Sequence, residues 1–181
     1  MMFTGWSADN LDRTFNWIPK EQYTGRVQYS YQHKNAKINV RSELLRSKLV
    51  DRGTPLAPYR ETAIDQLYNN RRFDNSLSYS NKIGKSTIQM IAGNNYFNRT
   101  KNKYLKNLVS LDETIVPRAE EQDTQTFNAS VFRTIYGINK DRTAGIETLI
   151  GFDGNYEIGT GNRIADGSQE QLDAALFLSA E

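Results

Sequence analysis

The sequence predicts an all-β protein whose strands form an antiparallel up-and-down meander. Apolar and polar residues alternate with a period of two along most of the chain, which is the pattern of strands with two unlike faces. Short and long polar segments separate these alternating stretches in strict succession. Pro is rare, with 4 residues, whereas Tyr and Phe number 10 and 8, a balance that favours strands.

The first four predicted strands alternate most regularly. In the first of them, Val27, Tyr29 and Tyr31 share one face, and glutamine and serine residues occupy the other. The predicted bounds of the four strands are 23–33, 36–44, 70–80 and 86–98. Their polar alternates include Gln28, Gln32, Ser76, Ser78, Gln89 and Asn95.

Three further strands are predicted in the second half of the chain, at 124–136, 144–156 and 172–181. We expect all seven strands to be longer than the roughly 5–6 residues usual in soluble sheets. For the fifth strand, the alternation predicts an apolar face made of Phe127, Ala129, Val131 and Ile135.

The connections between the strands distinguish the two ends of the meander. Short turns are predicted at 33–35, 81–85 and 138–141, and each contains an adjacent Asn and Lys. Asn tolerates the left-handed backbone of tight hairpins. Strict alternation with long segments places all short turns at one end, as in transmembrane β-barrels with short periplasmic turns and long extracellular loops. The predicted long loops are 45–69, 99–123 and 158–170.

Composition excludes several classes of protein. The formal net charge is +2, too small to predict nucleic-acid binding. Cys is absent, and His33 is the lone histidine with no Ser or Asp pairing in view, so we expect no enzyme, no metal site and no cofactor. Mean hydropathy is −0.69. No apolar run reaches the roughly 18 residues of a membrane helix, whereas strands of a transmembrane barrel remain compatible with this composition.

Several stretches of the chain are informative when they are read together. They are Phe3-Thr4-Gly5-Trp6-Ser7-Ala8-Asp9, Trp17-Ile18-Pro19-Lys20, Ala63-Ile64-Asp65-Gln66-Leu67-Tyr68-Asn69-Asn70-Arg71-Arg72, Tyr96-Phe97-Asn98-Arg99-Thr100-Lys101, Gln122-Asp123-Thr124, Gly151-Phe152-Asp153, Gly161-Asn162-Arg163-Ile164 and Ala174-Ala175-Leu176-Phe177-Leu178-Ser179-Ala180. Together they resemble a TonB-dependent outer-membrane receptor of the kind common in Bacteroidetes-type bacteria. No single motif is specific, and the order and spacing of the stretches over nearly the whole chain carry the resemblance.

The resemblance implies a location in the bacterial outer membrane and a role in the uptake of a scarce nutrient, an iron siderophore or cobalamin. Receptors of this family enclose a plug domain in a barrel of about 22 strands. The resemblance therefore implies that residues 1–181 are a middle segment of the barrel without the plug. The implied partners are outer-membrane lipid and lipopolysaccharide, the nutrient, and the TonB energy-coupling complex acting through the plug.

Candidate ligand contacts lie in the predicted long loops, where Arg and Tyr suit anionic or catecholate-type ligands through charge and stacking. Adjacent Arg71 and Arg72 form a paired cation beside aromatic residues, which a nutrient or a lipopolysaccharide phosphate could use. Solvated loop charges without a binding role are the alternative. The candidates are Tyr59, Arg60, Tyr68, Arg71, Arg72, Arg99, Tyr104, Asn162 and Arg163.

A soluble β-rich binding or surface protein is the alternative for the whole chain. The two interpretations differ in what covers the apolar face, because a barrel turns it toward lipid and a soluble domain buries it. Residues expected to face lipid are Ile88, Met90, Ala92, Ile146, Ile150, Phe152, Leu176 and Leu178. Aromatics near strand ends would form an interfacial girdle in a barrel or cross-strand pairs in any sheet; they are Tyr23, Tyr31, Tyr79, Tyr96, Phe97, Tyr136 and Tyr156.

Overall fold

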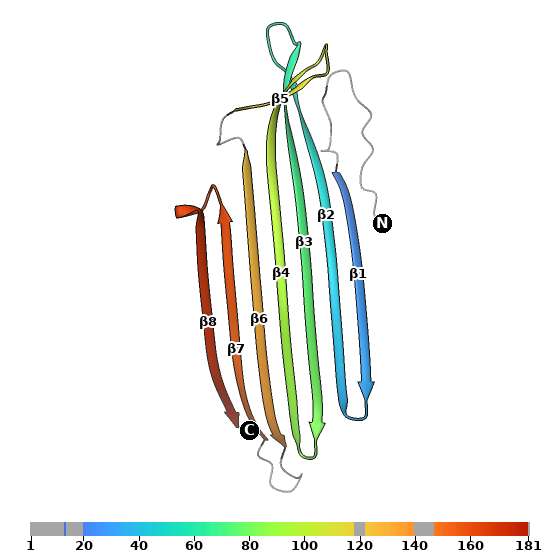
Figure 1. Ribbon diagram of the computed structural model, residues 1–181, viewed down its shortest axis with the longest axis vertical. Helices are drawn as coiled ribbons and strands as arrows, with labels where there is room; N and C mark the ends of the chain where they lie inside the picture. Colours follow the sequence, from blue (N-terminus) through green and yellow to red (C-terminus); the bar gives the residue numbers. More distant parts are fainter. Residues whose placement is uncertain (1–12, 14–19, 118–121, 140–146, 181) are drawn as a thin grey trace.

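The described part of the chain is one antiparallel sheet. The computed structural model describes residues 13, 20–117, 122–139 and 147–180. The strands follow the spatial order β1-β2-β3-β4-β6-β7-β8, and the short β5 pairs with β4 outside this path. Each long strand pairs with the next long strand along the chain, so the sheet is an up-and-down meander (Figure 1). The predicted all-β fold class is confirmed.

The strands are long and most are joined at the turn end by short connections. Their bounds are β1 Lys20–His33, β2 Ala36–Pro55, β3 Thr62–Ile83, β4 Ser86–Asn107, β5 Glu113–Ile115, β6 Asp123–Asn139, β7 Glu147–Gly161 and β8 Ser168–Ala180. A 3-10 turn, Ala165–Gly167, precedes β8. Within the described part, no helix has the length and apolar character required to cross a membrane.

Several strands extend far beyond their predicted bounds at the end opposite the short turns. β3 and β4 have 22 residues each and run through parts of the segments that the alternation predicts as loops. In these parts of the strands the residues are mostly polar on both faces. The alternation of apolar and polar residues is therefore lost, although the backbone hydrogen bonding between the strands continues. Asn69, for example, pairs with both Lys48 and Thr100. Hydrogen bonding between strands does not require apolar side chains.

Two of the predicted short turns are confirmed as two-residue hairpins, Lys34-Asn35 and Gly84-Lys85. The left-handed residue of the first turn is Lys34, with φ of 49°, and not the expected Asn35. Gly84 takes this role in the second turn, with φ of 60°. The third predicted turn, 138–141, lies largely outside the described residues.

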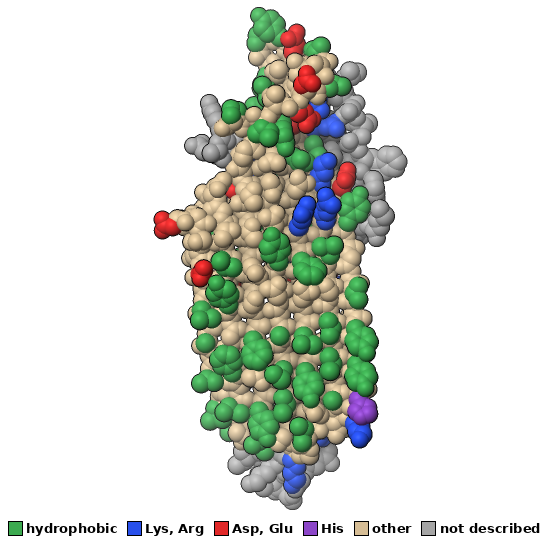
Figure 2. Space-filling model, viewed as in Figure 1, with side chains coloured by type: hydrophobic (Ala, Val, Ile, Leu, Met, Phe, Trp, Pro, Cys, Tyr) green, Lys and Arg blue, Asp and Glu red, His purple; other side chains and the backbone are tan. Residues whose placement is uncertain are grey.

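Large apolar side chains gather on one face of the sheet, in the half nearest the short turns (Figure 2). Direct cross-strand partners lie on the same face, and one row of such partners is Val40, Leu77, Ala92 and Phe132. We call this side the apolar face and the opposite side the polar face. The apolar band is the part of the apolar face that lies level with residues 36–44 of β2. The register confirms this face for Ile88, Met90, Ala92, Ile150, Phe152, Leu176 and Leu178, and Ile146 lies outside the described residues.

The polar face carries the polar alternates expected on it, but the prediction for β6 is wrong. Val131 pairs with Gly93 and Asn155, which are residues of the polar face. Phe127, Ala129 and Ile135 share this side, and Phe132 and Tyr136 occupy the apolar face instead. Apolar residues stand on both sides of β6, so its own alternation does not fix its orientation, and pairing with β4 does.

Aromatic side chains mark both edges of the apolar band. Tyr31 and Tyr79 flank Ile38 near the short turns, and the Tyr136 hydroxyl donates to Ser86 Oγ at 2.9 Å. The prediction that Phe97 belongs to the aromatic girdle is wrong, because its pairing with Arg72 and Phe127 places it on the polar face. At the opposite edge of the apolar band lie Phe73, Tyr96 and Tyr156, and Tyr23, the direct partner of Arg46, lies just beyond it.

Little of the apolar band is covered by protein. Among the described residues, Ala63 is the one buried hydrophobic side chain. Leu172 and Leu176 on β8 are 75% and 82% exposed. Apolar surface left in water costs about 25 cal/mol per Å². The alternating stretch 36–44 of β2 also has a length near the roughly 9–11 residues of a transmembrane strand. A sheet of this kind requires either lipid or a second layer of protein against the apolar face.

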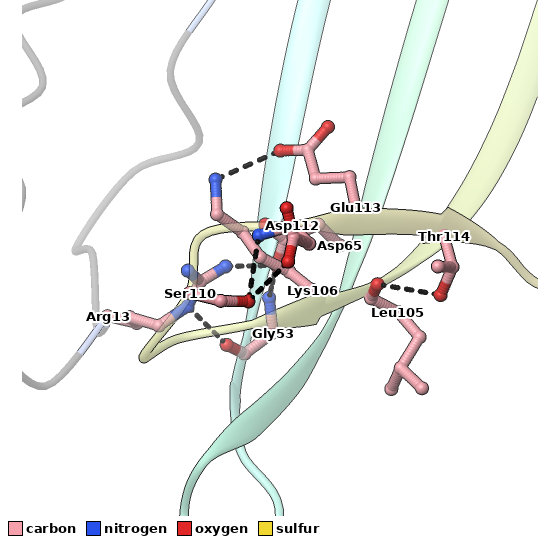
Figure 3. Close-up of polar contacts among 9 residues, drawn as sticks. All are labelled: Arg13, Gly53, Asp65, Leu105, Lys106, Ser110, Asp112, Glu113 and Thr114. Atoms are coloured by element: carbon pink, nitrogen blue, oxygen red, sulfur yellow. Dashed lines mark hydrogen bonds and ion pairs between the residues drawn. The ribbon is translucent and has the colours of Figure 1, made fainter.

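A bulge shapes β2 near the long-loop end, where its register with β3 shifts between Arg52 and Pro55. Gly53 lies in this bulge, and a Cβ atom there would stand 2.2 Å from the backbone oxygen of Ile64. The Gly53 carbonyl accepts from Arg13 Nε at 3.0 Å, and its N–H donates to Asp65 Oδ1 at 3.3 Å (Figure 3). Arg13 also forms an ion pair with Asp65, and both side chains are 11% exposed.

We expect Gly53→Ala to lower the free energy of unfolding by about 1–3 kcal/mol, because the methyl group has to displace the β3 backbone. Gly25→Ala is the matched control, since nothing lies within 4 Å of a Cβ atom there. Its effect should stay within about 0.5 kcal/mol. Urea unfolding in detergent micelles, followed by circular dichroism, measures both. Equal stability of the two variants would contradict the close approach at Gly53.

Candidate ligand-binding groove

A groove of 540 Å³ lies on the polar face of β1–β4, level with the far edge of the apolar band and beyond it. The pairing register builds it, since Gln22, Ser47, Asn70 and Arg99 form one row across the four strands. Its lining residues are Lys20, Gln22, Leu45, Ser47, Leu49, Asp51, Tyr68, Asn70, Arg72, Phe97 and Arg99.

Arg99 and Tyr68 form a stacked pair in this groove. Asn70 is the direct partner of Arg99, and Tyr68 is two residues from Asn70 on the same face. Diagonal neighbours of this kind are within reach of long side chains. The guanidinium carbon of Arg99 lies 5.2 Å from the centre of the Tyr68 ring, a cation–π contact. The Tyr68 hydroxyl donates to Gln66 Oε1 at 3.0 Å, which orients the ring.

Arg72 is held by a carboxylate on its own strand. Its Nε lies 2.8 Å from Asp74 Oδ2, and the two side chains are 54% and 31% exposed. Residues two apart on a strand project to the same side, and Asp74 also accepts from Asn95 Nδ2. A planar guanidinium has five N–H donors in all. The exposed Arg72 can therefore keep this contact and bind an anion as well.

The charge of the groove is positive. Among the described residues that line it, Lys20, Arg72 and Arg99 are cationic and Asp51 is the single carboxylate. Tyr68 and Phe97 add aromatic surface between the cations. Guanidinium groups bind carboxylates and similar planar anions through paired hydrogen bonds. The arrangement suits an anionic ligand with an aromatic or flat polar body.

The structure brings together Tyr68, Arg72 and Arg99 of the sequence-predicted residues. Arg71 and Arg72 do not act as a pair, because neighbours on a strand point to opposite faces. Arg71 pairs with Arg46 and Asn98 on the apolar face. The prediction of a paired cation is therefore wrong.

The other predicted residues lie apart from the groove. Tyr59 and Arg60 are in the turn after β2, where Tyr59 is 82% exposed. Tyr104 of β4 pairs with Asp65 and Ile115 near the end of the sheet, on the same side as Arg71.

Asn162 and Arg163 hold the turn after β7 against the beginning of β6. Asn162 Nδ2 donates to the Gln122 carbonyl at 3.2 Å. Arg163 Nε lies 3.2 Å from Asp123 Oδ2, and Asp123 is 8% exposed. A buried carboxylate is costly without a counter-charge. The contacts of Asn162 and Arg163 therefore have a structural role, which is to stabilise this turn.

Sequence reasoning misses the groove residues of β1 and β2, among them Lys20, Gln22, Ser47 and Asp51. They lie far from β3 and β4 in the sequence, and no local motif links them. The register of the sheet is the signal that would have found them. Ser47, for instance, is 5% exposed and accepts from Asn70 Nδ2 at 3.1 Å.

A second polar cluster lies at the long-loop end and has a structural explanation. Lys106 Nζ lies 2.9 Å from Glu113 Oε1, which ties β5 to β4. Ser110 Oγ donates to Asp112 Oδ2 at 2.7 Å within the turn between them (Figure 3). Among the described residues, no group of three or more His, Asp and Glu could hold a metal ion.

Comparisons with known proteins identify similar structures and no similar sequence. No family model matches the chain, and no curated protein does. BauA, the ferric preacinetobactin receptor from Acinetobacter baumannii, is similar with a TM-score of 0.55 and 10% identity, over 90% of this chain and 28% of that chain. The ferric citrate transporter FecA in the unliganded form is similar with a TM-score of 0.51 and 13% identity, over 89% of this chain and 24% of that chain.

The chain therefore spans about a quarter of the length of these two proteins. The sequence identity is low, so the similarity concerns the fold. It supports the antiparallel meander of a β-barrel wall as the architecture of this chain. The two similar structures are a receptor and a transporter, and neither is described as an enzyme.

Proposed function

We propose that this chain is part of the barrel wall of a TonB-dependent receptor in a bacterial outer membrane, with no enzymatic role. The observation that best supports this proposal is the apolar band. It has aromatic residues at its edges, and the described residues cover almost none of it. The sheet also has two edges, β1 and β8. Unpaired edges are costly in a membrane, and further strands on both sides would close the barrel.

The proposed ligand is an anionic ferric chelate. The groove on the polar face carries three cations and one carboxylate, which favours an anion over cobalamin. The two similar structures are those of a ferric preacinetobactin receptor and a ferric citrate transporter, which supports a ligand of this class. Tyr68, Arg72 and Arg99 are the proposed contacts. The groove lies on the polar face, at the level where the apolar band ends on the other side of the sheet.

The remaining partners of this proposal follow from the barrel. Lipid would contact the apolar band, and the TonB energy-coupling complex would act through a plug that this part of the chain does not contain. A soluble β-rich protein is the other candidate. It would require a second layer over Leu172, Leu176 and their neighbours, and the described residues include none.

Uptake by the complete receptor tests the proposal. We expect deletion of its gene to abolish uptake of one radiolabelled anionic ferric chelate, and the intact gene to restore it, whereas labelled cobalamin uptake is unchanged. Cell fractionation should place the protein in the outer membrane. Loss of cobalamin uptake alone would overturn the ligand class. Recovery of the protein from the soluble fraction, with a cooperative melt in plain buffer, would overturn the barrel.

A further inference from the structure

A pair of arginines stands directly beyond the apolar band on the apolar face. Arg46 of β2 and Arg71 of β3 are direct cross-strand partners, two residues past the partners Leu44 and Phe73. At about 3.3 Å per residue they lie roughly 7 Å further along their strands. Lys48 follows Arg46 on the same face. Figure 2 shows Lys and Arg side chains gathered at this level, directly beyond the apolar side chains.

The two arginines have no counter-charge among the residues that the structure describes. Like charges directly opposite each other destabilise a strand pair. Neither Arg46 nor Arg71 has an ion pair or hydrogen bond among the described residues, and both are exposed. The carboxylate nearest in register is Glu21, the partner of Lys48, and no ion pair joins these two.

Several arginines elsewhere on the sheet have a carboxylate partner. On the polar face, Arg41 reaches Glu43 at 2.6 Å and Arg133 reaches Asp153. Arg26 also contacts Glu43, at 3.0 Å. Arg46 and Arg71 are direct cross-strand partners and lack such a carboxylate among the described residues, and an external anion would supply the missing charge.

A polar groove of 270 Å³ lies between the two arginines and β4. Amide and hydroxyl groups add hydrogen-bond donors to the guanidinium groups there. Arginine binds phosphate through paired, charge-assisted hydrogen bonds. Its lining residues are Arg46, Asn69, Asn70, Arg71, Asn98 and Thr100.

We propose that Arg46 and Arg71, with Lys48 beside them, bind the phosphate group of a membrane lipid whose acyl chains lie along the apolar band. The inference rests on the proposed function, because the apolar face meets lipid when the sheet is a barrel wall. The distance of the arginines from Leu44 and Phe73 corresponds to the step from acyl chains to head group. Free phosphate would gain the same charge contacts but none of the apolar surface.

The test compares lipid binding by the complete receptor and its variants in detergent, measured by native mass spectrometry with titrated lipid A. We expect the double variant Arg46→Gln/Arg71→Gln to bind lipid A about tenfold more weakly or worse. Arg72→Gln is the matched control, since it removes the adjacent arginine from the opposite face, and its lipid A affinity should be unchanged. Diacylglycerol, which has chains without phosphate, should bind wild type and double variant alike.

Three outcomes would overturn the lipid site. The double variant could retain wild-type affinity for lipid A, Arg72→Gln could weaken it equally, or inorganic phosphate could bind wild type as tightly as lipid A does. Migration of each unheated variant on a denaturing gel reports whether the barrel has folded, and Arg46→Lys/Arg71→Lys replaces the double variant if it has not. Ferric chelate binding by wild type and by the double variant separates the two proposals. If the chelate binds but the lipid A results contradict the lipid site, the receptor function still stands.

Discussion

Arginine in place of Leu77 should lower the free energy of unfolding in a lipid bilayer by about 2–4 kcal/mol, the cost of a cation at the bilayer midplane on a barrel surface. Leu77 lies in the middle of the apolar band, between Val40 and Ala92, and is 45% exposed. The expected loss arises because no water or carboxylate is available there to stabilise the guanidinium. Urea titration of the complete receptor in phospholipid vesicles measures it.

Ser76→Arg is the control for this prediction, because it places the same side chain on the polar face of the same strand. Its cross-strand partner is Arg41, and Glu43 is a diagonal neighbour. Attraction and repulsion nearly cancel, and we expect a change within about 1 kcal/mol. Leu44→Arg, at the edge of the apolar band, should cost only about 0–1 kcal/mol. Similar losses at Leu44 and Leu77 would indicate a face covered by protein instead of lipid.

Alanine in place of Arg99 should weaken binding of the anionic ferric chelate by about 10- to 100-fold, since a hydrogen bond to a charged group contributes about 1.5–3 kcal/mol. Arg72→Ala should have an effect in the same range. The guanidinium of Arg99 also stacks on the Tyr68 ring, 5.2 Å away, and a lysine lacks this planar group. Arg99→Lys should therefore retain only part of the wild-type affinity. Isothermal titration of the purified receptor in detergent measures all three variants.

Arg71→Ala is the control for the groove, because it removes the arginine beside Arg72 from the opposite face. Ligand affinity should be unchanged in this variant. Equal weakening by Arg71→Ala and Arg72→Ala would contradict the assignment of the ligand to the polar face. Together with the lipid experiment, in which Arg71 matters and Arg72 does not, the two neighbours provide a reciprocal test of the two faces.

Alternation over 36–44 and 70–80 was sufficient to predict the strands of the apolar band, because one face there is apolar and the other polar. The same reasoning stopped near Leu45 and Asn70, where both faces become polar and the period of two carries no hydrophobic signal. It therefore assigned Tyr68 and Arg99 to loops, although they lie on β3 and β4. Candidate residue types were recognised, but not the elements that carry them.

By itself, the sequence determined the all-β class, the meander and the side of most strands that is apolar, since these depend on local periodicity and on turn chemistry. The tertiary structure decided the register, and with it which distant residues share a row. Gln22, Ser47, Asn70 and Arg99 meet through cross-strand pairing alone. Pairing also separated Arg71 from Arg72 and set the orientation of β6. Register is a property of the whole ladder, because backbone hydrogen bonds fix it between strands far apart in the chain.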